Sequence, residues 1–227
     1  MDFNKTTDSY REKVKDSISF ANADSDLILE VKANLILKTL KDKFQNFENI
    51  SVLDVGCGVG LMDQLLCPPL KNLSGVDIAQ DAVKKAETLN PNVHYSSYDG
   101  KQLPFQDDFF MACFVVCVLH HVPPKEWIDL LLDIKRTLKT GGLLFVFEHN
   151  PWNPLTRLVT TRCELDEDAA LISPLKMRAL MKGSGFKILD SRAILYFPWR
   201  GAFLRKLDTM LGQLYLGGQY YFFCEKA

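Results

Sequence analysis

The run Val52-Leu53-Asp54-Val55-Gly56-Cys57-Gly58-Val59-Gly60 constrains the fold more than any other part of this chain. Apolar residues that end in a glycine-rich turn are typical of a buried strand in a parallel sheet. Glycines at alternate positions let the backbone turn sharply and approach a ligand where no Cβ stands in the way. A helix after such a turn directs its free N–H groups toward that ligand. The run therefore predicts a strand, a ligand-binding turn and a helix.

Strand-like and helix-like runs alternate along the rest of the sequence, which favours βαβ units and a parallel sheet. We expect a doubly wound, mostly parallel α/β sheet of seven strands with an N-terminal helical extension. The expected strands are 50–55, 73–77, 93–95, 111–118, 143–147, 186–197 and 219–224. The expected helices are 27–47, 61–66, 81–89, 123–138, 165–172, 173–182 and 204–211. Residues 150–161, with two prolines, predict a loop.

Composition excludes several classes of protein. The 227 residues carry 27 Lys and Arg against 28 Asp and Glu, so no global basic field is available to bind nucleic acid. The six cysteines are scattered without a CxxC pair, and no cluster has metal-ligand spacing, so we expect no metal. The N-terminus is polar and lacks the apolar stretch of a signal peptide, and the run 109–119 is too short to span a bilayer. We therefore expect a cytoplasmic protein without membrane insertion; its oligomeric state stays open.

The spacing of the glycines separates two kinds of nucleotide site. Dinucleotide-binding proteins use G-x-G-x-x-G. Here the three glycines follow G-x-G-x-G, Leu61 occupies the position of the third dinucleotide glycine, and Asp54 lies inside the end of the strand. This spacing argues against an NAD-dependent oxidoreductase, which we keep as an alternative.

The run VLDVGCGVG closely resembles the first motif of class I S-adenosylmethionine (SAM)-dependent methyltransferases, and the resemblance covers about residues 52–148, within the broad type 11 group. It implies a Rossmann-like methyltransferase fold with SAM as cofactor and S-adenosylhomocysteine as product. It also implies that the cofactor contacts the turn, through Asp54, Gly56, Cys57, Gly58 and Gly60.

Two acidic positions downstream match the family in order and spacing. Asp77, followed by Ile78, ends the second strand, where the resemblance implies a carboxylate that accepts both ribose hydroxyls. A helix N-cap is the other interpretation of Asp77. Asp99, followed by Gly100, lies where similar enzymes bind the adenine amino group, although a plain turn residue would suit the same sequence.

The fourth strand ends in Val116-Cys117, followed by His120 and His121, and resembles the segment that lies beside the methionine part of SAM in type 11 methyltransferases. There the backbone of Val116 or Cys117 would face the cofactor. His121 could act as a general base, because histidine titrates near neutral pH, or it could pack against the next helix.

Glu148, His149 and Asn150 follow the fifth strand, and ligands of doubly wound sheets bind at the carboxyl ends of strands. The stretch EHNP-x-NP-x-TR also resembles a segment of some bacterial type 11 methyltransferases. These residues are therefore candidates for holding or deprotonating the methyl acceptor. The alternative is a proline-fixed loop in which Arg157 pairs with Glu164 or Asp166.

These observations predict a SAM-dependent methyltransferase that acts on a small molecule, first of all on oxygen, by in-line displacement. The candidate bases are His121, Glu148 and His149. In this scheme residues 1–48 form a helical lid, to which Tyr10 and Arg11 would belong, 49–149 the cofactor-binding core, and 150–227 the acceptor side of a single domain. A SAM-binding protein without catalytic activity is the second alternative.

Overall fold

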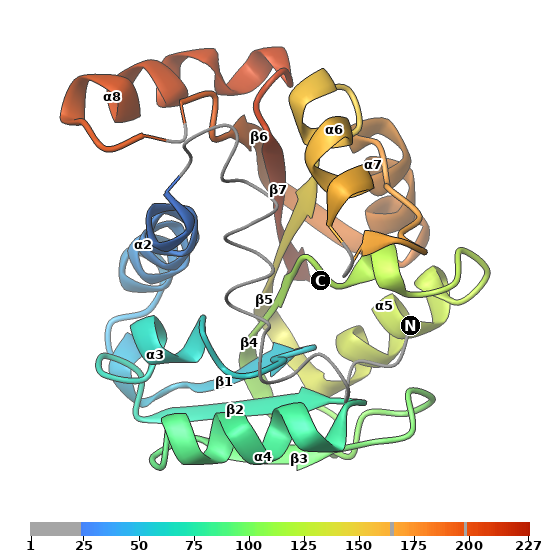
Figure 1. Ribbon diagram of the computed structural model, residues 1–227. Helices are drawn as coiled ribbons and strands as arrows, with labels where there is room; N and C mark the ends of the chain where they lie inside the picture. Colours follow the sequence, from blue (N-terminus) through green and yellow to red (C-terminus); the bar gives the residue numbers. More distant parts are fainter. Residues whose placement is uncertain (1–23, 164–165, 198) are drawn as a thin grey trace.

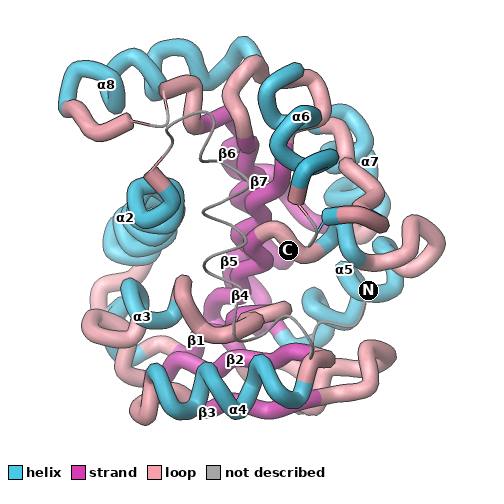
Figure 2. The backbone as a smooth tube through the Cα atoms, viewed as in Figure 1, coloured by secondary structure: helices cyan, strands magenta, loops and turns pink. Residues whose placement is uncertain are grey.

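The computed structural model describes residues 24–163, 166–197 and 199–227, so Tyr10, Arg11, Glu164 and the first 23 residues of the predicted lid lie outside the described residues. A seven-stranded sheet forms the centre, with helices on both sides (Figure 1, Figure 2). The strands are β1 (Ser51–Val55), β2 (Asn72–Asp77), β3 (His94–Ser97), β4 (Phe110–Val116), β5 (Leu138–His149), β6 (Phe186–Ile194) and β7 (Gln219–Lys226). The α-helices are α2 (Ser25–Lys43), α3 (Asp63–Leu66), α4 (Gln80–Leu89), α5 (Trp127–Thr137), α6 (Pro154–Arg162), α7 (Pro174–Gly183) and α8 (Ala202–Leu211). Three short 3-10 turns complete the elements: η2 (Phe47–Asn49), η3 (Leu119–His121) and η5 (Gly212–Leu214).

The strand order is β3-β2-β1-β4-β5-β7-β6. Strands β1 to β5 are parallel to one another, while β7 inserts antiparallel between β5 and β6. The sheet is thus doubly wound and mostly parallel, as predicted. Because the order reverses between β1 and β4, the carboxyl ends of these strands open a crevice where this kind of sheet binds ligands.

Two apolar clusters cover the two faces of the sheet. On one face α5 and α7 bury side chains such as Leu131 and Met177 against β4, β5 and β7. On the other face α2 and α3 bury side chains such as Ile36 and Leu66. The central strands are buried on both faces, which is why they read as continuous apolar runs. None of the helices in the described part of the chain has the length and apolar character that a membrane span requires.

Three local predictions were wrong. The predicted loop 150–161 contains helix α6, because the Asn153 side chain accepts a hydrogen bond from the backbone of Thr156 and Pro154 occupies the first turn. The described residues of the predicted helix 165–172 contain no α-helix. Strand β5 begins at Leu138 rather than Leu143, since Gly141, with a positive φ of 76°, lies within the strand instead of ending helix α5.

Candidate functional site

A cavity of about 810 Å³ opens at the carboxyl ends of β1, β2, β4 and β5, and α2 and α6 also contribute to its wall. All of the predicted cofactor residues except Gly60 line it, together with His121 and His149. Strand ends that are far apart in the sequence therefore meet in one hollow, as a parallel sheet requires.

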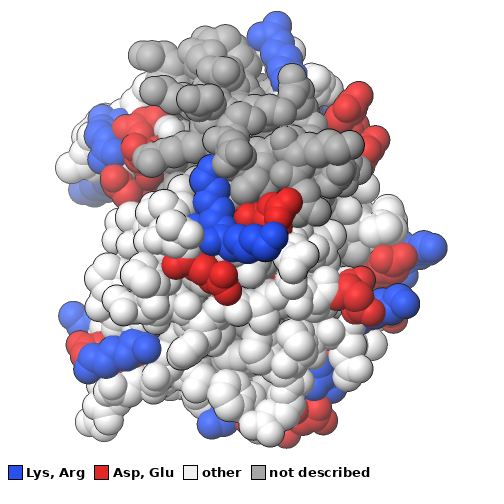
Figure 3. All heavy atoms as spheres, turned by 60° about the horizontal axis from the view of Figure 1, so that its bottom comes forward, with Lys and Arg blue, Asp and Glu red and all other residues white. Residues whose placement is uncertain are grey.

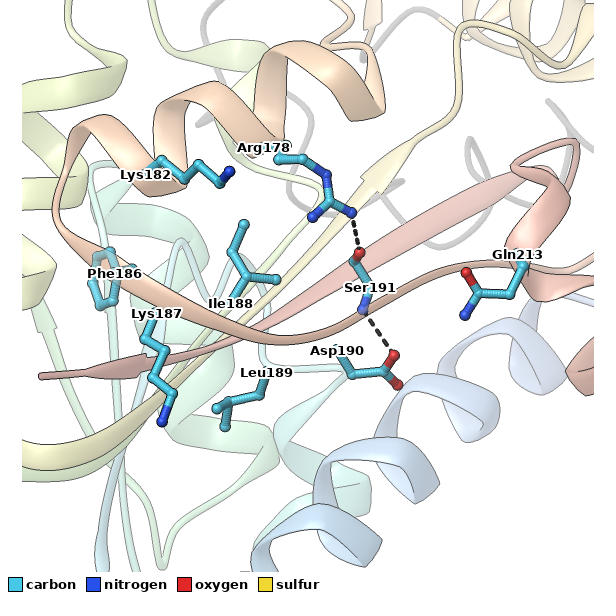
Figure 4. A pocket seen from close by; sticks show the side chains of 9 residues that line it. All are labelled: Arg178, Lys182, Phe186, Lys187, Ile188, Leu189, Asp190, Ser191 and Gln213. Carbon is cyan, nitrogen blue, oxygen red and sulfur yellow. Dashed lines mark hydrogen bonds between the residues drawn. The ribbon is translucent and has the colours of Figure 1, made fainter.

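A second hollow, of about 470 Å³, lies between β6 and α7 (Figure 4). Its polar groups satisfy one another: Arg178 Nη2 donates to Ser191 Oγ at 2.7 Å, and the Ser191 backbone N–H donates to Asp190 Oδ1 at 2.9 Å. None of the predicted site residues lies there. We therefore place the site in the larger cavity.

The glycine-rich turn packs so closely against neighbouring side chains that two of its positions leave no room for a Cβ atom. Gly56 and Gly60 have positive φ values of 79° and 76°. A Cβ on Gly56 would lie 2.4 Å from Val118 Cγ2, and one on Gly60 would lie 2.5 Å from Asn90 Nδ2. These two glycines are required by the protein's own packing. Gly58 differs, because a Cβ there would meet no protein atom within 4 Å and the residue lines the cavity.

A buried polar network supports this turn from beneath. Asn90 Nδ2 donates to the Gly60 carbonyl at 2.9 Å and to Tyr95 Oη at 2.9 Å, and Tyr95 Oη donates to Asp63 Oδ2 at 2.7 Å. Burial and the neighbouring carboxyl group of Asp63 raise the pKa of Asp54 well above its usual value. Asp54 also lines the cavity. Sequence reasoning missed Asp63, Asn90 and Tyr95, although the acidic Asp63 within an apolar stretch was a usable signal.

Asp77 connects the turn to strand β2. Its Oδ2 accepts from the Gly58 N–H and its Oδ1 from the Ala79 N–H, both at 2.8 Å. Burial raises the pKa of Asp77, while these hydrogen bonds oppose the shift. The Ala79 bond fits the capping interpretation in part, since helix α4 begins one residue later. The same carboxylate also borders the cavity, so both interpretations stay compatible with the geometry.

Asp99 and Gly100 border the cavity beside Ile78 and Tyr98. Asp99 Oδ1 accepts from the Lys101 backbone N–H at 3.0 Å, which is a turn contact. Ile78 is 55% exposed in spite of its apolar side chain. An exposed isoleucine and a tyrosine next to a carboxylate form a slot suited to a flat ring with an amino group. Sequence reasoning did not identify Tyr98.

At the end of β4 the Cys117 backbone adopts a left-handed conformation, with φ of 57°. Its Sγ lies 3.6 Å from Lys32 Nζ and 3.6 Å from Gln219 Nε2. Burial raises the pKa of the Cys117 thiol, but the positive charge of Lys32 and the interaction with His149 outweigh that effect and lower the pKa to about 7. Lys32 and Gln219 were not predicted, because they lie on α2 and β7 and only the fold brings them to the cavity.

Glu148 lies behind the cavity wall, fully buried, rather than in the cavity. Its two oxygens accept from the Leu119 backbone N–H at 2.8 Å and contact His120 Nδ1 at 2.6 Å. Burial alone would raise the pKa of Glu148, but the charge and hydrogen bond of His120 hold it below its usual range. Burial likewise disfavours a charged His120, yet Glu148 and Asp166 raise the pKa of His120 to about 10.

His121 has the opposite electrostatic environment. Burial and the positive charge of His120 lower the pKa of His121 to about 4, although Asp166 opposes the shift. Near neutral pH His121 is therefore uncharged, and its ring lies in the cavity wall. His149 lines the cavity as well, and its Nδ1 lies 3.4 Å from Gln219 Nε2. Three histidine rings thus surround the inner end of the cavity.

Among the described residues, His120, His121 and Asp166 offer ligand atoms within 4.8 Å of one another, which is a spacing that a divalent ion could use. In the structure these groups contact each other instead: Asp166 Oδ1 lies 3.3 Å from His120 Nε2 and 3.7 Å from His121 Nε2. The carboxylate of Asp166 is thus shared by two imidazole rings. Sequence spacing could not indicate it, since Asp166 is distant along the chain.

Asn150 binds backbone carbonyls rather than an acceptor, and of the two acids expected to pair with Arg157, Glu164 lies outside the described residues. Asn150 is fully buried, and its amide nitrogen donates to the carbonyls of Tyr215 and Gly217 at 2.8 Å each. It holds the segment before β7 rather than an acceptor. Asp166, the expected partner of Arg157, contacts the two histidines.

Comparison with known proteins gives consistent results. Residues 53–146 match the family model described as a methyltransferase domain. The chain is 32% identical over 104 residues to a 2-methyl-6-phytyl-1,4-hydroquinone methyltransferase of Synechocystis, covering 44% of this chain and 32% of the relative. It is 25% identical over 176 residues to a ubiquinone biosynthesis O-methyltransferase of Coxiella burnetii, covering 72% of this chain and 74% of the relative.

The chain covers less than half the length of several curated relatives that it matches. The covered shares of three of them, the Synechocystis relative included, are 34%, 44% and 32%. Among solved structures, a SAM-dependent methyltransferase from Thermotoga maritima superposes with a TM-score of 0.66 at 19% identity, covering 99% of this chain and 98% of the other. One from Mesorhizobium loti gives a TM-score of 0.64 at 16% identity, covering 87% and 99%. At these identities the structural likeness shows the fold.

Proposed function

Because this chain carries a class I SAM-dependent methyltransferase domain, we propose that it transfers the methyl group of SAM to a small molecule, with oxygen as the first expected acceptor atom. The observation that carries the proposal is the single cavity in which the glycine-rich turn, two carboxylates and a neutral histidine meet. The names of the relatives, an O-methyltransferase and a hydroquinone methyltransferase, support a small oxygen-bearing acceptor.

The open space beside Gly58 supports SAM as the ligand of the cavity. Among the described residues, nothing lies within 4 Å of an added Cβ at Gly58, which lines the cavity, so the bare backbone leaves room there for a ligand. In the proposed arrangement the turn from Asp54 to Gly58 faces the cofactor, Asp77 accepts from the ribose hydroxyls, and Ile78, Asp99 and Gly100 flank the adenine. The backbone of Val116 and Cys117 borders the methionine part.

SAM supplies an already activated methyl group, so this chain's residues need to align the acceptor and, where required, remove a proton. Alignment alone contributes roughly 7–11 kcal/mol to lowering a barrier of this kind. In our proposal His121 accepts the acceptor's proton, because it is uncharged near neutral pH and lies in the cavity wall. His149 is the second candidate base, and Glu148 positions His120 without touching the acceptor.

The distribution of charge bears on the class of acceptor and on the location of the protein. On the face shown in Figure 3, positive and negative side chains lie next to each other and do not form a basic groove. Together with the net charge of -1, this supports a small-molecule acceptor over a nucleic acid. A cytoplasmic location agrees with both observations.

The experiment is a comparison of ligands followed by turnover. SAM and S-adenosylhomocysteine should raise the melting temperature of the protein, whereas NAD should not. Turnover of labelled SAM with hydroquinones and related phenols should then yield a labelled ether, and His121→Gln should lower kcat about 10²–10⁴-fold without weakening SAM binding. Stabilisation by NAD alone would refute the proposal.

A SAM-binding protein without methyl transfer is the second candidate, since a [4+2]-cyclase also superposes on this chain with a TM-score of 0.60 at 19% identity. One fold can host unrelated reactions. Tight SAM binding without any labelled product, across O-, N- and C-acceptors, would favour this candidate.

A further inference from the structure

Exposed apolar side chains gather at one end of the molecule. Among the described residues, fourteen large hydrophobic side chains are well exposed, and eight of them lie within 152–158 and 199–216. This concentration is far beyond an even distribution, and contiguous apolar patches of this kind mark contact surfaces. We call these eight residues the apolar face: Trp152, Leu155, Leu158, Trp199, Phe203, Met210, Leu214 and Leu216.

Contacts join the start of α6 to the segment that follows α8. The rings of Trp152 and Tyr215 lie 6.4 Å apart, and Asn153 Nδ2 donates to the Leu216 carbonyl at 2.7 Å. Helices α6 and α8 lie at the same end of the molecule, beyond the ends of β6 and β7 (Figure 1). The start of α6 therefore abuts the chain that follows α8.

Helix α8 presents its apolar residues outward. Phe203 and Met210 are 72% and 70% exposed, and Leu214, in the 3-10 turn that follows, is 60% exposed. Their spacing of seven and four residues places them on one face of a helix. Exposed Lys206 lies between them along that face. An outward stripe of phenylalanine, methionine and leucine with a lysine is the pattern of a helix that lies in a membrane interface.

Helices α6 and α8 carry a net positive charge, whereas the chain as a whole is slightly negative. Helices α6 and α8 contain four basic residues and one acid, Asp208. Asp208 is 7% exposed and pairs with Arg205, so it faces inward. The whole chain, in contrast, has a net charge of -1. Arg205 is neutralised by its pair with Asp208, so the exposed Arg157 and Lys206 supply the positive charge beside the apolar face, which is complementary to anionic lipid headgroups.

We propose that the apolar face docks on the surface of a bilayer that contains anionic lipids. The Phe203, Met210 and Leu214 side chains enter the interface, and the exposed Arg157 of α6 and Lys206 of α8 contact the headgroups. No part of the chain needs to cross the membrane for this contact.

Helix α6 connects this surface to the cavity. Leu155 is 45% exposed in the apolar face, and Val159 and Cys163, four and eight residues later on the same side of the helix, line the cavity. An acceptor drawn from the bilayer would have an apolar path to the histidines. This last point rests on the proposed methyl transfer, whereas docking does not.

Vesicle co-sedimentation tests the proposal with the full-length protein. Vesicles of phosphatidylcholine and phosphatidylglycerol should retain the wild-type protein, and vesicles of phosphatidylcholine alone should retain less, because the electrostatic attraction is absent. The double variant F203E/M210E should lower the bound fraction about tenfold or more, since it replaces two apolar side chains that would enter the bilayer with carboxylates that the anionic headgroups repel. Both side chains are exposed, so the variant should fold and bind SAM like the wild type.

The matched control is L132E/L175E, which adds the same charge at exposed leucines of α5 and α7 outside the apolar face, 46% and 67% exposed. It should bind vesicles like the wild type. An equal loss in this control, wild-type binding by F203E/M210E, or no vesicle binding by the wild type would overturn the proposal. So would a wild-type dimer in solution that F203E/M210E abolishes, because a second copy would then cover the face. Loss of vesicle binding with SAM binding intact separates this test from that of the proposed function.

Discussion

Replacing Gly58 by alanine tests whether the cofactor lies against the glycine-rich turn. Gly58 has φ of 53°, and an added Cβ meets nothing in the protein within 4 Å. The protein therefore suffers only the strain of a left-handed alanine, roughly 1–2 kcal/mol. For a domain of this size, that strain lowers the melting temperature by roughly 2–8 °C.

The same methyl group occupies cavity space that the cofactor needs. Overpacking by one methyl group in a filled contact costs roughly 1–3 kcal/mol. SAM affinity should therefore fall roughly 5- to 150-fold, since each 1.4 kcal/mol corresponds to a factor of ten. Isothermal titration calorimetry with SAM and with S-adenosylhomocysteine measures this loss directly.

Gly141 provides the matched control. It has φ of 76°, an added Cβ there also meets nothing within 4 Å, and it does not line the cavity. Gly141→Ala should lower the melting temperature by a similar amount and leave SAM affinity unchanged. If Gly58→Ala binds SAM as tightly as the wild type, or if both variants lose affinity equally, the assignment of the turn to the cofactor is wrong.

Three further predictions concern the carboxylates and the buried histidine. Glu148→Gln removes the negative partner of a buried His120 and should lower the free energy of unfolding by roughly 3–5 kcal/mol in urea titrations; an unchanged midpoint would contradict the buried pair. Because the pKa of His120 is raised from 6.5 to about 10, its contribution to stability is fully present below pH 6.5 and is lost as the pH rises toward 10. Urea midpoints should fall over that range in the wild type and less in His120→Gln, and equal slopes would count against the assignment. Asp99→Ala removes a charge-assisted hydrogen bond to the adenine, worth roughly 1.5–3 kcal/mol, so SAM affinity should drop about 10- to 150-fold while the melting temperature hardly changes.

Local patterns were sufficient for the core of the fold. Continuous apolar runs predicted the central strands because both faces of a parallel sheet are covered, and the glycine-rich run predicted the turn because its backbone angles exclude other residues. Patterns failed where capping overrides composition: two prolines between 150 and 161 indicated a loop, yet the Asn153 cap starts a helix there. Proline is well tolerated in the first turn of a helix, so a proline alone does not distinguish a loop from the start of a helix.

For the site, the sequence by itself determined the residues that are adjacent along the chain: the glycines of the turn, the acids at the ends of β2 and β3, and the two histidines after β4. Only the tertiary structure decided which groups face one another. It placed Glu148 behind His120, brought Asp166 between two histidines, and set Lys32 beside Cys117. The physical reason is that charge state and burial depend on neighbours in space, and those neighbours come from helices and strands that the sheet order, not the sequence order, brings together.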